Sequence, residues 1–268
     1  MVVPEIADRI TLRSARPEIV RESIRRGDWT TNTVGLSAGY TQTNLVILPR
    51  EYAYDFPLFC QRNPGPCPLV DVTEVGSPVP LKAARSADLR VDLPAYRVYE
   101  HGELVEEPAS IVHHWRDDLV AFLLGCSYTF EYALDQANVG LRHLNEGRNV
   151  SMFRTNQRCA SAGRLHGPLV VSMRPIRSDR VARAVEVTSR YPLAHGAPVW
   201  IGDPDGLGIP SITEPDWGET LTPEPGEVPV FWACGVTPQA VAMEAKPPLM
   251  ITHSPGHMFI TDIPISML

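Results

Sequence analysis

Two apolar stretches constrain the fold most, because each has the pattern of a buried strand followed at once by a tight turn and a helix. They span residues 119–134 and 228–242. Each apolar run ends in a small residue and a cysteine, Cys126 or Cys234, and a small residue, an apolar residue and a threonine follow. An uninterrupted apolar run of about four to eight residues is typical of a buried strand. We therefore expect two matched strand–turn–helix units.

The residues after each cysteine predict where the helices start. Thr129 and Thr237 occupy N-cap positions, and Pro238 suits a first helical position. A helix start directs free N–H groups at the turn, here at Ser127 and Gly235, which favours a bound carboxylate or another anion. The same field would lower the pKa of the cysteine. The alternative is that both cysteines are inert core residues, the commoner role at the end of an apolar strand.

The composition limits the classes of protein to consider. The chain has 268 residues, of which 44% are hydrophobic and 21% charged, as in globular proteins of one large or two small domains. A net charge of -7, without a Lys/Arg-rich window, argues against a nucleic-acid partner. The charged N-terminus and the lack of a run of about 20 apolar residues argue against membrane insertion. We expect a cytoplasmic protein whose five cysteines are reduced thiols.

Local patterns predict the remaining elements. Residues 8–27 form one or two amphipathic helices, and residues 91–107 form a hairpin. We also expect a short strand at 139–143, and a strand at 168–174 followed by a helix at 178–191. Together these elements predict an α/β fold, a two-domain, mixed-sheet α/β sandwich with an inserted smaller α+β domain. The main domain comprises residues 1–146 plus 223–268, and the inserted domain comprises residues 147–222.

Cys60 and Cys67 are joined by a loop that contains Asn63-Pro-Gly-Pro. This rigid loop can bring the two thiols together. A zinc site would need a second cysteine pair at short spacing, and the other three cysteines do not supply one. We therefore expect no metal and no cofactor.

Two further motifs were weighed as sources of catalysis. Gly35-Leu-Ser37-Ala-Gly39 matches the pattern of a hydrolase nucleophile elbow, but an extended run follows where the elbow needs a helix, so we assign it no catalytic role. His253 and His257 flank Pro255 and Gly256, which exclude a helix, so we place them on a turn between two apolar strands. They are candidates for proton transfer, and the alternative is a surface or hydrogen-bonded role.

Long strings of the chain carry a family resemblance. They are FCQRNPGPCPLVDVTE, WRDDLVAFLLGCSYTFEYAL, EGRNVSMFRTN, GPLVVSMRPI, HGAPVWIGDP, VPVFWACGVTPQAVA and THSPGHMF. These strings resemble the D-glutamate cyclase family, whose bacterial members carry the name hydro-lyase, and the resemblance extends from about Ala38 to Asp262. It implies a two-domain α/β fold with an inserted domain, and reversible loss of water from D-glutamate to give 5-oxo-D-proline. No catalytic residue is carried over from the family.

This reaction defines the groups that a site must supply. It must bind two carboxylates, take protons from an ammonium group and protonate a departing hydroxyl. A helix start with a bidentate arginine suits the α-carboxylate, and the N–H groups of a turn suit an oxyanion. The substrate-binding candidates are Ser127, Thr129, Arg148, Arg154, Asn156, Arg174, Gly235, Thr237 and Gln239. The catalytic candidates are Cys126, Cys234, His253 and His257, with Glu131 and Asp117 after them.

The leading hypothesis is thus a cofactor-independent lyase that acts on a small carboxylated amino acid or its lactam between the two cysteine turns. Two alternatives stay open. One is a non-catalytic protein that binds or senses a small carboxylate, and the other is a lyase or lactam hydrolase for another acid. The expected partner is a small carboxylate, and the sequence also permits a homodimer.

Overall fold

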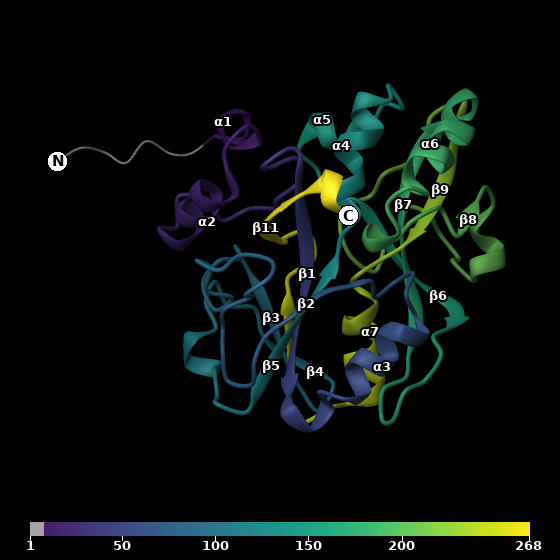
Figure 1. Cartoon of the computed structure of the whole chain (residues 1–268). Helices are drawn as coiled ribbons and strands as arrows, with labels where there is room; N and C mark the ends of the chain where they lie inside the picture. Colours follow the sequence, from purple (N-terminus) through teal and green to yellow (C-terminus); the bar gives the residue numbers. More distant parts are fainter. Residues whose placement is uncertain (1–7) are drawn as a thin grey trace.

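The computed structural model describes residues 8–268, which two β-sheets organise (Figure 1). The larger sheet has seven strands in the order β2-β5-β1-β10-β3-β4, with β11 also paired to β1, and the smaller has four in the order β6-β7-β9-β8. The strands are β1 (Tyr40–Pro49), β2 (Leu69–Val72), β3 (Tyr96–Glu100), β4 (Glu103–Glu106), β5 (Leu119–Gly125), β6 (Ser151–Arg158), β7 (Pro168–Arg177), β8 (Trp200–Ile201), β9 (Glu227–Ala233), β10 (Met250–His253) and β11 (Phe259–Pro264).

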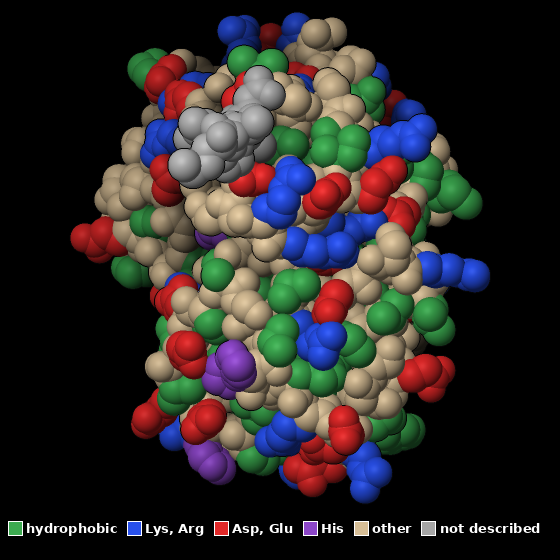
Figure 2. Space-filling view, turned by 90° about the vertical axis from the view of Figure 1, so that its left-hand side faces the viewer, with side chains coloured by type: hydrophobic (Ala, Val, Ile, Leu, Met, Phe, Trp, Pro, Cys, Tyr) green, Lys and Arg blue, Asp and Glu red, His purple; other side chains and the backbone are tan. Residues whose placement is uncertain are grey.

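Short helices connect and cover these sheets. They are α1 (Arg9–Arg13), α2 (Pro17–Arg25), α3 (Asp55–Arg62), α4 (Tyr128–Gln136), α5 (Arg142–Glu146), α6 (Val181–Thr188) and α7 (Thr237–Ala245). Among the described residues, no helix is both long and apolar enough to cross a membrane. Basic and acidic side chains are interspersed on the face shown in Figure 2.

The α/β class is confirmed, but the expected mixed sheet is wrong, because every strand pairing within residues 8–268 is antiparallel. Both β1 and β2 pair antiparallel with β5, so these two strands point the same way but are separated by β5. Residues 50–68, which include α3, connect the two strands and are long enough for a parallel crossover, which needs about a dozen residues or more. The chain instead places an oppositely directed strand between the two.

The two matched units are confirmed as strand–turn–helix, but they belong to different sheets. The first is β5 followed by α4, and the second is β9 followed by α7. Strand β9 pairs with β7 and β8 in the smaller sheet, although the predicted domain division assigns it to the main domain. The division at residues 147 and 222 stays a prediction.

The helix of each unit contacts its own sheet and also packs apolar side chains against the other sheet. Phe130 of α4 lies in the apolar cluster with Trp232 of the smaller sheet, and their rings are 5.5 Å apart. Val241 of α7 lies in the cluster with Phe122 of the larger sheet. This exchange brings the two turns toward each other between the sheets.

Smaller predictions divide into confirmed and wrong ones. The hairpin at 91–107 is confirmed as β3 and β4, joined by His101 and Gly102 with φ of 49° and 86°. The strand predicted at 139–143 is wrong, because residues 142–146 form α5 and its flanking apolar side chains, Leu141 and Leu144, pack at helical spacing into one cluster.

Candidate functional site

The two cysteine turns lie on either side of one side chain, Asn44 of β1. Its Nδ2 donates to the carbonyl of Gly125 in the first turn at 2.7 Å. In the second turn, a Cβ added to Gly235 would lie only 2.0 Å from the same nitrogen. The glycine is therefore required by close approach, and Asn44 fills the space between the turns. The structure thus brings the turns together, as the sequence predicts.

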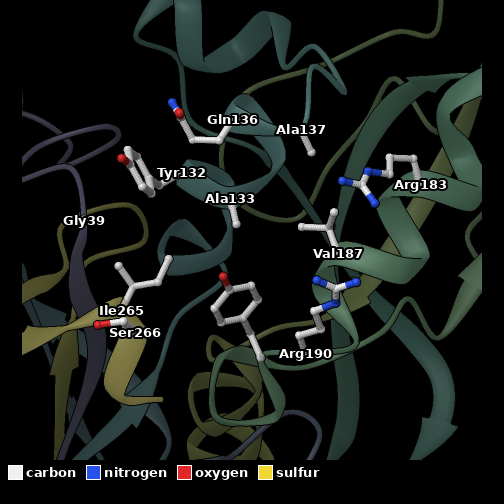
Figure 3. Close-up of a pocket in the computed structure, with 11 residues that line it drawn as sticks. Gly39, Tyr132, Ala133, Gln136, Ala137, Arg183, Val187, Arg190, Ile265 and Ser266 are labelled. Carbon is white, nitrogen blue, oxygen red and sulfur yellow. The ribbon is translucent and has the colours of Figure 1, made fainter.

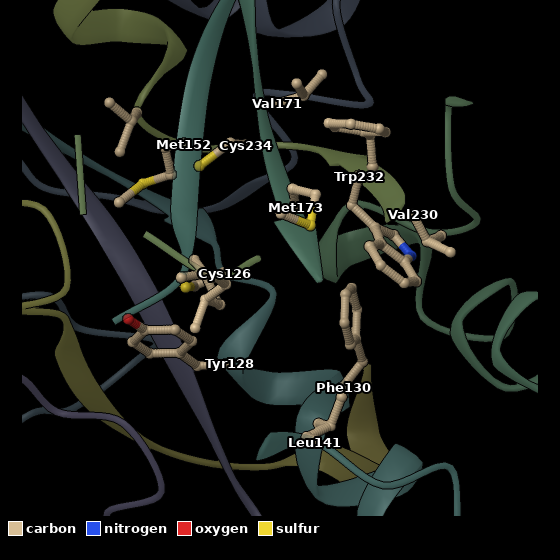
Figure 4. Packing of buried hydrophobic residues seen from close by; sticks show 14 of the residues in the cluster. Cys126, Tyr128, Phe130, Leu141, Met152, Val171, Met173, Val230, Trp232 and Cys234 are labelled. Atoms are coloured by element: carbon tan, nitrogen blue, oxygen red, sulfur yellow. The ribbon is translucent and has the colours of Figure 1, made fainter. Parts of the chain in front are cut away.

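The expected lowering of the cysteine pKa values is wrong. Cys126 and Cys234 are 5% and 7% exposed and lie in an apolar cluster with side chains such as Met152 (Figure 4). Burial raises the pKa of the Cys234 thiol to about 11, and it raises the pKa of Cys126 further. Removing a thiolate from water thus outweighs the backbone hydrogen bonds that the turns offer. Near neutral pH both thiols are protonated, and their catalytic role stays a prediction.

The two threonines are not helix caps, and this expectation is also wrong. Each lies inside the first turn of its helix, where its hydroxyl bonds to the backbone of a neighbouring strand. The N–H of Gln42 donates to Thr129 Oγ1 at 3.1 Å, and the N–H of Val170 donates to Thr237 Oγ1 at 3.0 Å. Both threonines therefore connect a helix start to a strand, and their hydroxyl groups already have hydrogen-bond partners within the protein.

In the first unit, Glu131 of α4 holds Arg174 of β7 in a fully buried ion pair. Arg174 Nε donates to Glu131 Oε1 at 2.9 Å, and His143 Nε2 lies 2.9 Å from the same oxygen. Arg174 also donates to Ser127 Oγ at 2.8 Å and to Ser172 Oγ at 3.1 Å. Burial alone would raise the pKa of Glu131, but the charges of His143 and Arg174 together lower it. The positive charge of Arg174 is thus neutralised inside the protein.

In the second unit, Gln239 of α7 occupies the position that matches Glu131 and contacts a different arginine. Its Nε2 donates to the carbonyl of His253 at 2.9 Å. Its Oε1 accepts from Tyr99 Oη at 3.2 Å and from Arg97 Nη1 at 3.4 Å. A neutral amide does not cancel the charge of Arg97. The only carboxylate paired with it within the described chain is that of Glu107, which is 45% exposed.

Arg97 lies in the wall of an open pocket of about 560 Å³, within the size range of small-molecule sites. The pocket is lined by parts of the chain far apart in sequence. The lining residues are Thr30, Thr31, Asn32, Arg97, Asn149, Asp216, Trp217, Gly218, Glu219, Ser254, Pro255 and His257. The pocket therefore lies where the turn after β10 meets the segment before β6 and the loop before β9.

Asn149 is the most firmly held polar group of this pocket. Tyr128 of the first unit donates to its Oδ1 at 2.5 Å, and its Nδ2 donates to the carbonyl of Pro255 at 3.2 Å. A Cβ on Gly256 would lie 2.4 Å from that Nδ2, so this turn requires glycine. The matched units therefore hold two side chains of the pocket wall in place. Tyr128 of the first unit binds Asn149, and Gln239 of the second unit binds Arg97.

The two histidines, His253 at the end of β10 and His257 in the turn after it, have different surroundings. His257 lines the pocket, with its Nδ1 3.1 Å from the carbonyl of Pro255, and burial lowers the pKa of its imidazole. His253 is fully buried and accepts the N–H of Leu45 at its Nδ1 at 3.2 Å. Burial lowers the pKa of His253 to about 3, so it is neutral. Of the two, only His257 can reach a ligand in this pocket.

The other arginines predicted to bind substrate lie elsewhere. Arg148 pairs at the surface with Glu146 and Glu219. Arg154 and Asn156 line another hollow, of about 440 Å³, beside α7. The structure therefore does not bring Arg148, Arg154, Asn156 and Arg174 to one site.

A further hollow, of about 470 Å³, lies between α4 and α6 (Figure 3). Its cations, Arg183 and Arg190, both pair with Glu186 at 2.6 Å, and its lining is mainly apolar. Across residues 8–268, no group of three or more His, Cys, Asp or Glu side chains is arranged to hold a metal ion. The pocket of Arg97 and His257 is therefore the best candidate site.

Sequence reasoning missed Arg97. It lies in a strand between the buried residues Tyr96 and Val98, and the hairpin pattern gave no sign that this position faces a pocket. Asn149 lies in a string that carries the family resemblance, but its position against the turn after β10 depends on contacts between distant segments.

Comparison with known proteins assigns the family. The family model described as D-glutamate cyclase matches residues 120–262, which include both matched units and most of the pocket wall. The chain belongs to the D-glutamate cyclase family. The resemblance seen in the sequence is thereby confirmed.

Other members of the D-glutamate cyclase family match almost the full length of the chain. A protein of Rubrobacter xylanophilus is 62% identical over 90% of this chain and 93% of its own length. A Thermoanaerobacter protein is 57% identical over 97% and 98%, and one from Geobacillus kaustophilus is 60% identical over 91% and 92%. All three bear the name "Putative hydro-lyase".

Among solved structures, a nitrogen repressor-like protein of Methanococcus jannaschii aligns over 88% of this chain and 91% of its own. The TM-score is 0.38 at 9% identity, too low to support a conclusion about fold or function.

Proposed function

We propose that this protein is a hydro-lyase that converts D-glutamate to 5-oxo-D-proline and water, and the reverse, in the pocket of Arg97 and His257. The family description and the names of the relatives support the reaction class. One observation carries the choice of substrate class. The pocket combines an arginine whose charge is not cancelled by its buried partner with two carboxylates, Asp216 and Glu219, from another segment.

This arrangement of charges complements an amino acid. Arg97 receives the α-carboxylate, because a guanidinium group forms charge-assisted bonds to a carboxylate. Asp216 attracts the ammonium group, since a negative charge favours the charged form of an amine. Asn149 and Ser254 offer polar hydrogens for the second carboxyl group, whose carbon is attacked by the amine.

Proton transfer is assigned to His257. Ring closure moves two protons from the ammonium nitrogen to the departing oxygen, which leaves as water. Because burial lowers the pKa of His257, its imidazole is neutral near pH 7 and ready to accept the first proton. The protonated ring gives this proton to the carboxylate oxygen that will leave. After the C–N bond has formed, His257 takes the second proton from the nitrogen and returns it to the resulting hydroxyl, which departs as water.

The assay follows interconversion of D-glutamate and 5-oxo-D-proline by chiral chromatography with mass detection. Arg97→Met and His257→Gln should each lower kcat/KM by about 10² to 10³-fold. Arg158→Met, in the hollow beside α7, is the matched control and should retain nearly full activity. Folded wild-type protein that converts neither compound would contradict the proposal, and saturable binding without conversion would identify a carboxylate-binding protein instead.

The same assay tests the two thiols. If Cys126 or Cys234 acts chemically, replacement by serine lowers turnover by orders of magnitude. If both variants keep their activity, the thiols serve only in packing.

A further inference from the structure

Two thiols that the proposed reaction does not use lie together at a separate pocket. Cys60 of α3 and Cys67, just beyond the Asn63–Pro66 loop, are buried and belong to the same apolar cluster. Both line a pocket of about 260 Å³ together with Gln61, Leu69, Leu193 and four prolines. A small molecule that enters this pocket thus reaches a lining that contains both cysteines.

The loop between the thiols is fixed at both ends. The N–H of Cys67 donates to the carbonyl of Asn63 at 3.0 Å, and Asn63 Nδ2 donates to the carbonyl of Phe59 at 2.8 Å. Asn63 Oδ1 also accepts the N–H of Ala160 at 2.8 Å. The loop therefore holds both thiols at one pocket and in one apolar cluster, which makes Cys60 and Cys67 candidates for a disulfide.

We propose that Cys60 and Cys67 form a reversible disulfide by exchange with a small-molecule disulfide that enters this pocket. Cys60, the more exposed of the two thiols, attacks one sulfur and releases one small thiol. Cys67 then attacks the Cys60 sulfur of the mixed disulfide and releases the second. The two cysteines lose two electrons and two protons, and the small disulfide becomes two thiols.

The environment of Cys67 predicts how the rate depends on pH. Burial, followed by the contact with Cys60, raises the pKa of the Cys67 thiol well above its ordinary value. Because the thiolate is the attacking form, closure of the disulfide should accelerate steadily as the pH rises above neutrality. Cys159 and Cys234 also lie near Cys67 and are the competing partners that an experiment must separate.

Peptide mapping separates these outcomes. Folded wild-type protein is incubated with hydroxyethyl disulfide at about pH 8.5, quenched with acid and digested with trypsin. Cleavage after Arg62 separates the two cysteines, so their disulfide joins peptides 51–62 and 63–82, whereas Cys159 lies in peptide 159–164. We expect the joined pair, a loss of about 2 Da in the intact mass, and reversal by dithiothreitol.

Two variants sharpen the result. Cys159→Ser should give the same joined peptides, and Cys67→Ser should leave a stable mixed disulfide on Cys60. A link between Cys67 and Cys159 would overturn the proposal. So would unreacted thiols in the folded wild type under conditions in which the urea-unfolded chain forms the disulfide, and this comparison does not depend on the folding of a variant.

Discussion

The two strand–turn–helix units share a sequence frame and differ at one decisive position. In both, a glycine permits close approach, and a threonine fastens the helix start to a neighbouring strand. At the matched helical position, the first unit has Glu131 and the second has Gln239. Each side chain contacts an arginine of the sheet that its own strand does not belong to, Arg174 or Arg97.

This difference separates a structural ion pair from a candidate binding group. Glu131 cancels the charge of Arg174, and both side chains are buried. Gln239 orients Arg97 but leaves it charged at the edge of the open pocket. The choice between a carboxylate and an amide, which differ little in shape, therefore decides whether the arginine has a buried counter-ion, as Arg174 does, or only a half-exposed one, as Arg97 does in Glu107.

The largest expected effect comes from removing the two matched side chains. Glu131→Ala leaves Arg174 buried without its counter-ion and should lower the free energy of unfolding by about 3–5 kcal/mol. Gln239→Ala loses neutral hydrogen bonds and should cost only about 1–2 kcal/mol. Urea denaturation followed by circular dichroism measures both values. Equal losses would show that the two positions do not differ in this way.

A smaller effect, on ligand affinity, is expected when the second unit receives a carboxylate at the position where the first has Glu131. Gln239→Glu places a carboxylate beside Arg97, and the affinity for 5-oxo-D-proline should fall about 10 to 100-fold, because the arginine then has a buried counter-ion in addition to the half-exposed Glu107. Calorimetric titration measures the affinity. The control is Gln136→Glu on α4, because Gln136 lines the hollow between α4 and α6. An unchanged affinity would exclude Arg97 as the anion-binding group.

The pH dependence of stability should differ between the two regions. His253, behind Gln239, has its pKa lowered to about 3 in the fold, so its contribution is complete above about pH 6.5 and is lost as the pH falls, by at most about 1.4 kcal/mol per pH unit. The pKa of Glu131 is also lowered, so its contribution is lost only below about pH 4.5. His195 and His257 also have lowered pKa values. His253→Asn should therefore make the decline between about pH 6.5 and 5 less steep without abolishing it, and Glu131→Gln should leave its slope unchanged.

The smallest difference is expected at the two threonines. Thr129→Val and Thr237→Val each remove one hydroxyl that binds a strand backbone, and each should cost about 1 kcal/mol. The two losses should agree within about 0.5 kcal/mol, because the contacts match. A clearly larger loss at one site, measured by urea denaturation, would limit the similarity of the units to their backbone.

Local features were predictable to the extent that they depend on neighbours in the chain. The strand–turn–helix units, the break at Pro17 between α1 and α2, and the turn that carries His253 and His257 all follow from runs of a few residues. The cysteine pKa was not predictable, because burial by distant side chains outweighs the local field of the helix start. The strand predicted at residues 139–143 was wrong for a similar reason, because the packing of Leu141 and Leu144 into a distant cluster favours a helix there.

The sequence by itself determined the family, the α/β class and two matched strand–turn–helix units, because long specific strings and short periodic patterns carry that information. Only the tertiary structure decided that the units belong to different sheets. It also decided that Glu131 neutralises Arg174 while Gln239 leaves Arg97 charged beside His257. The physical reason is that the state of a charge depends on which groups the fold brings within a few ångströms, and those groups come from distant parts of the chain.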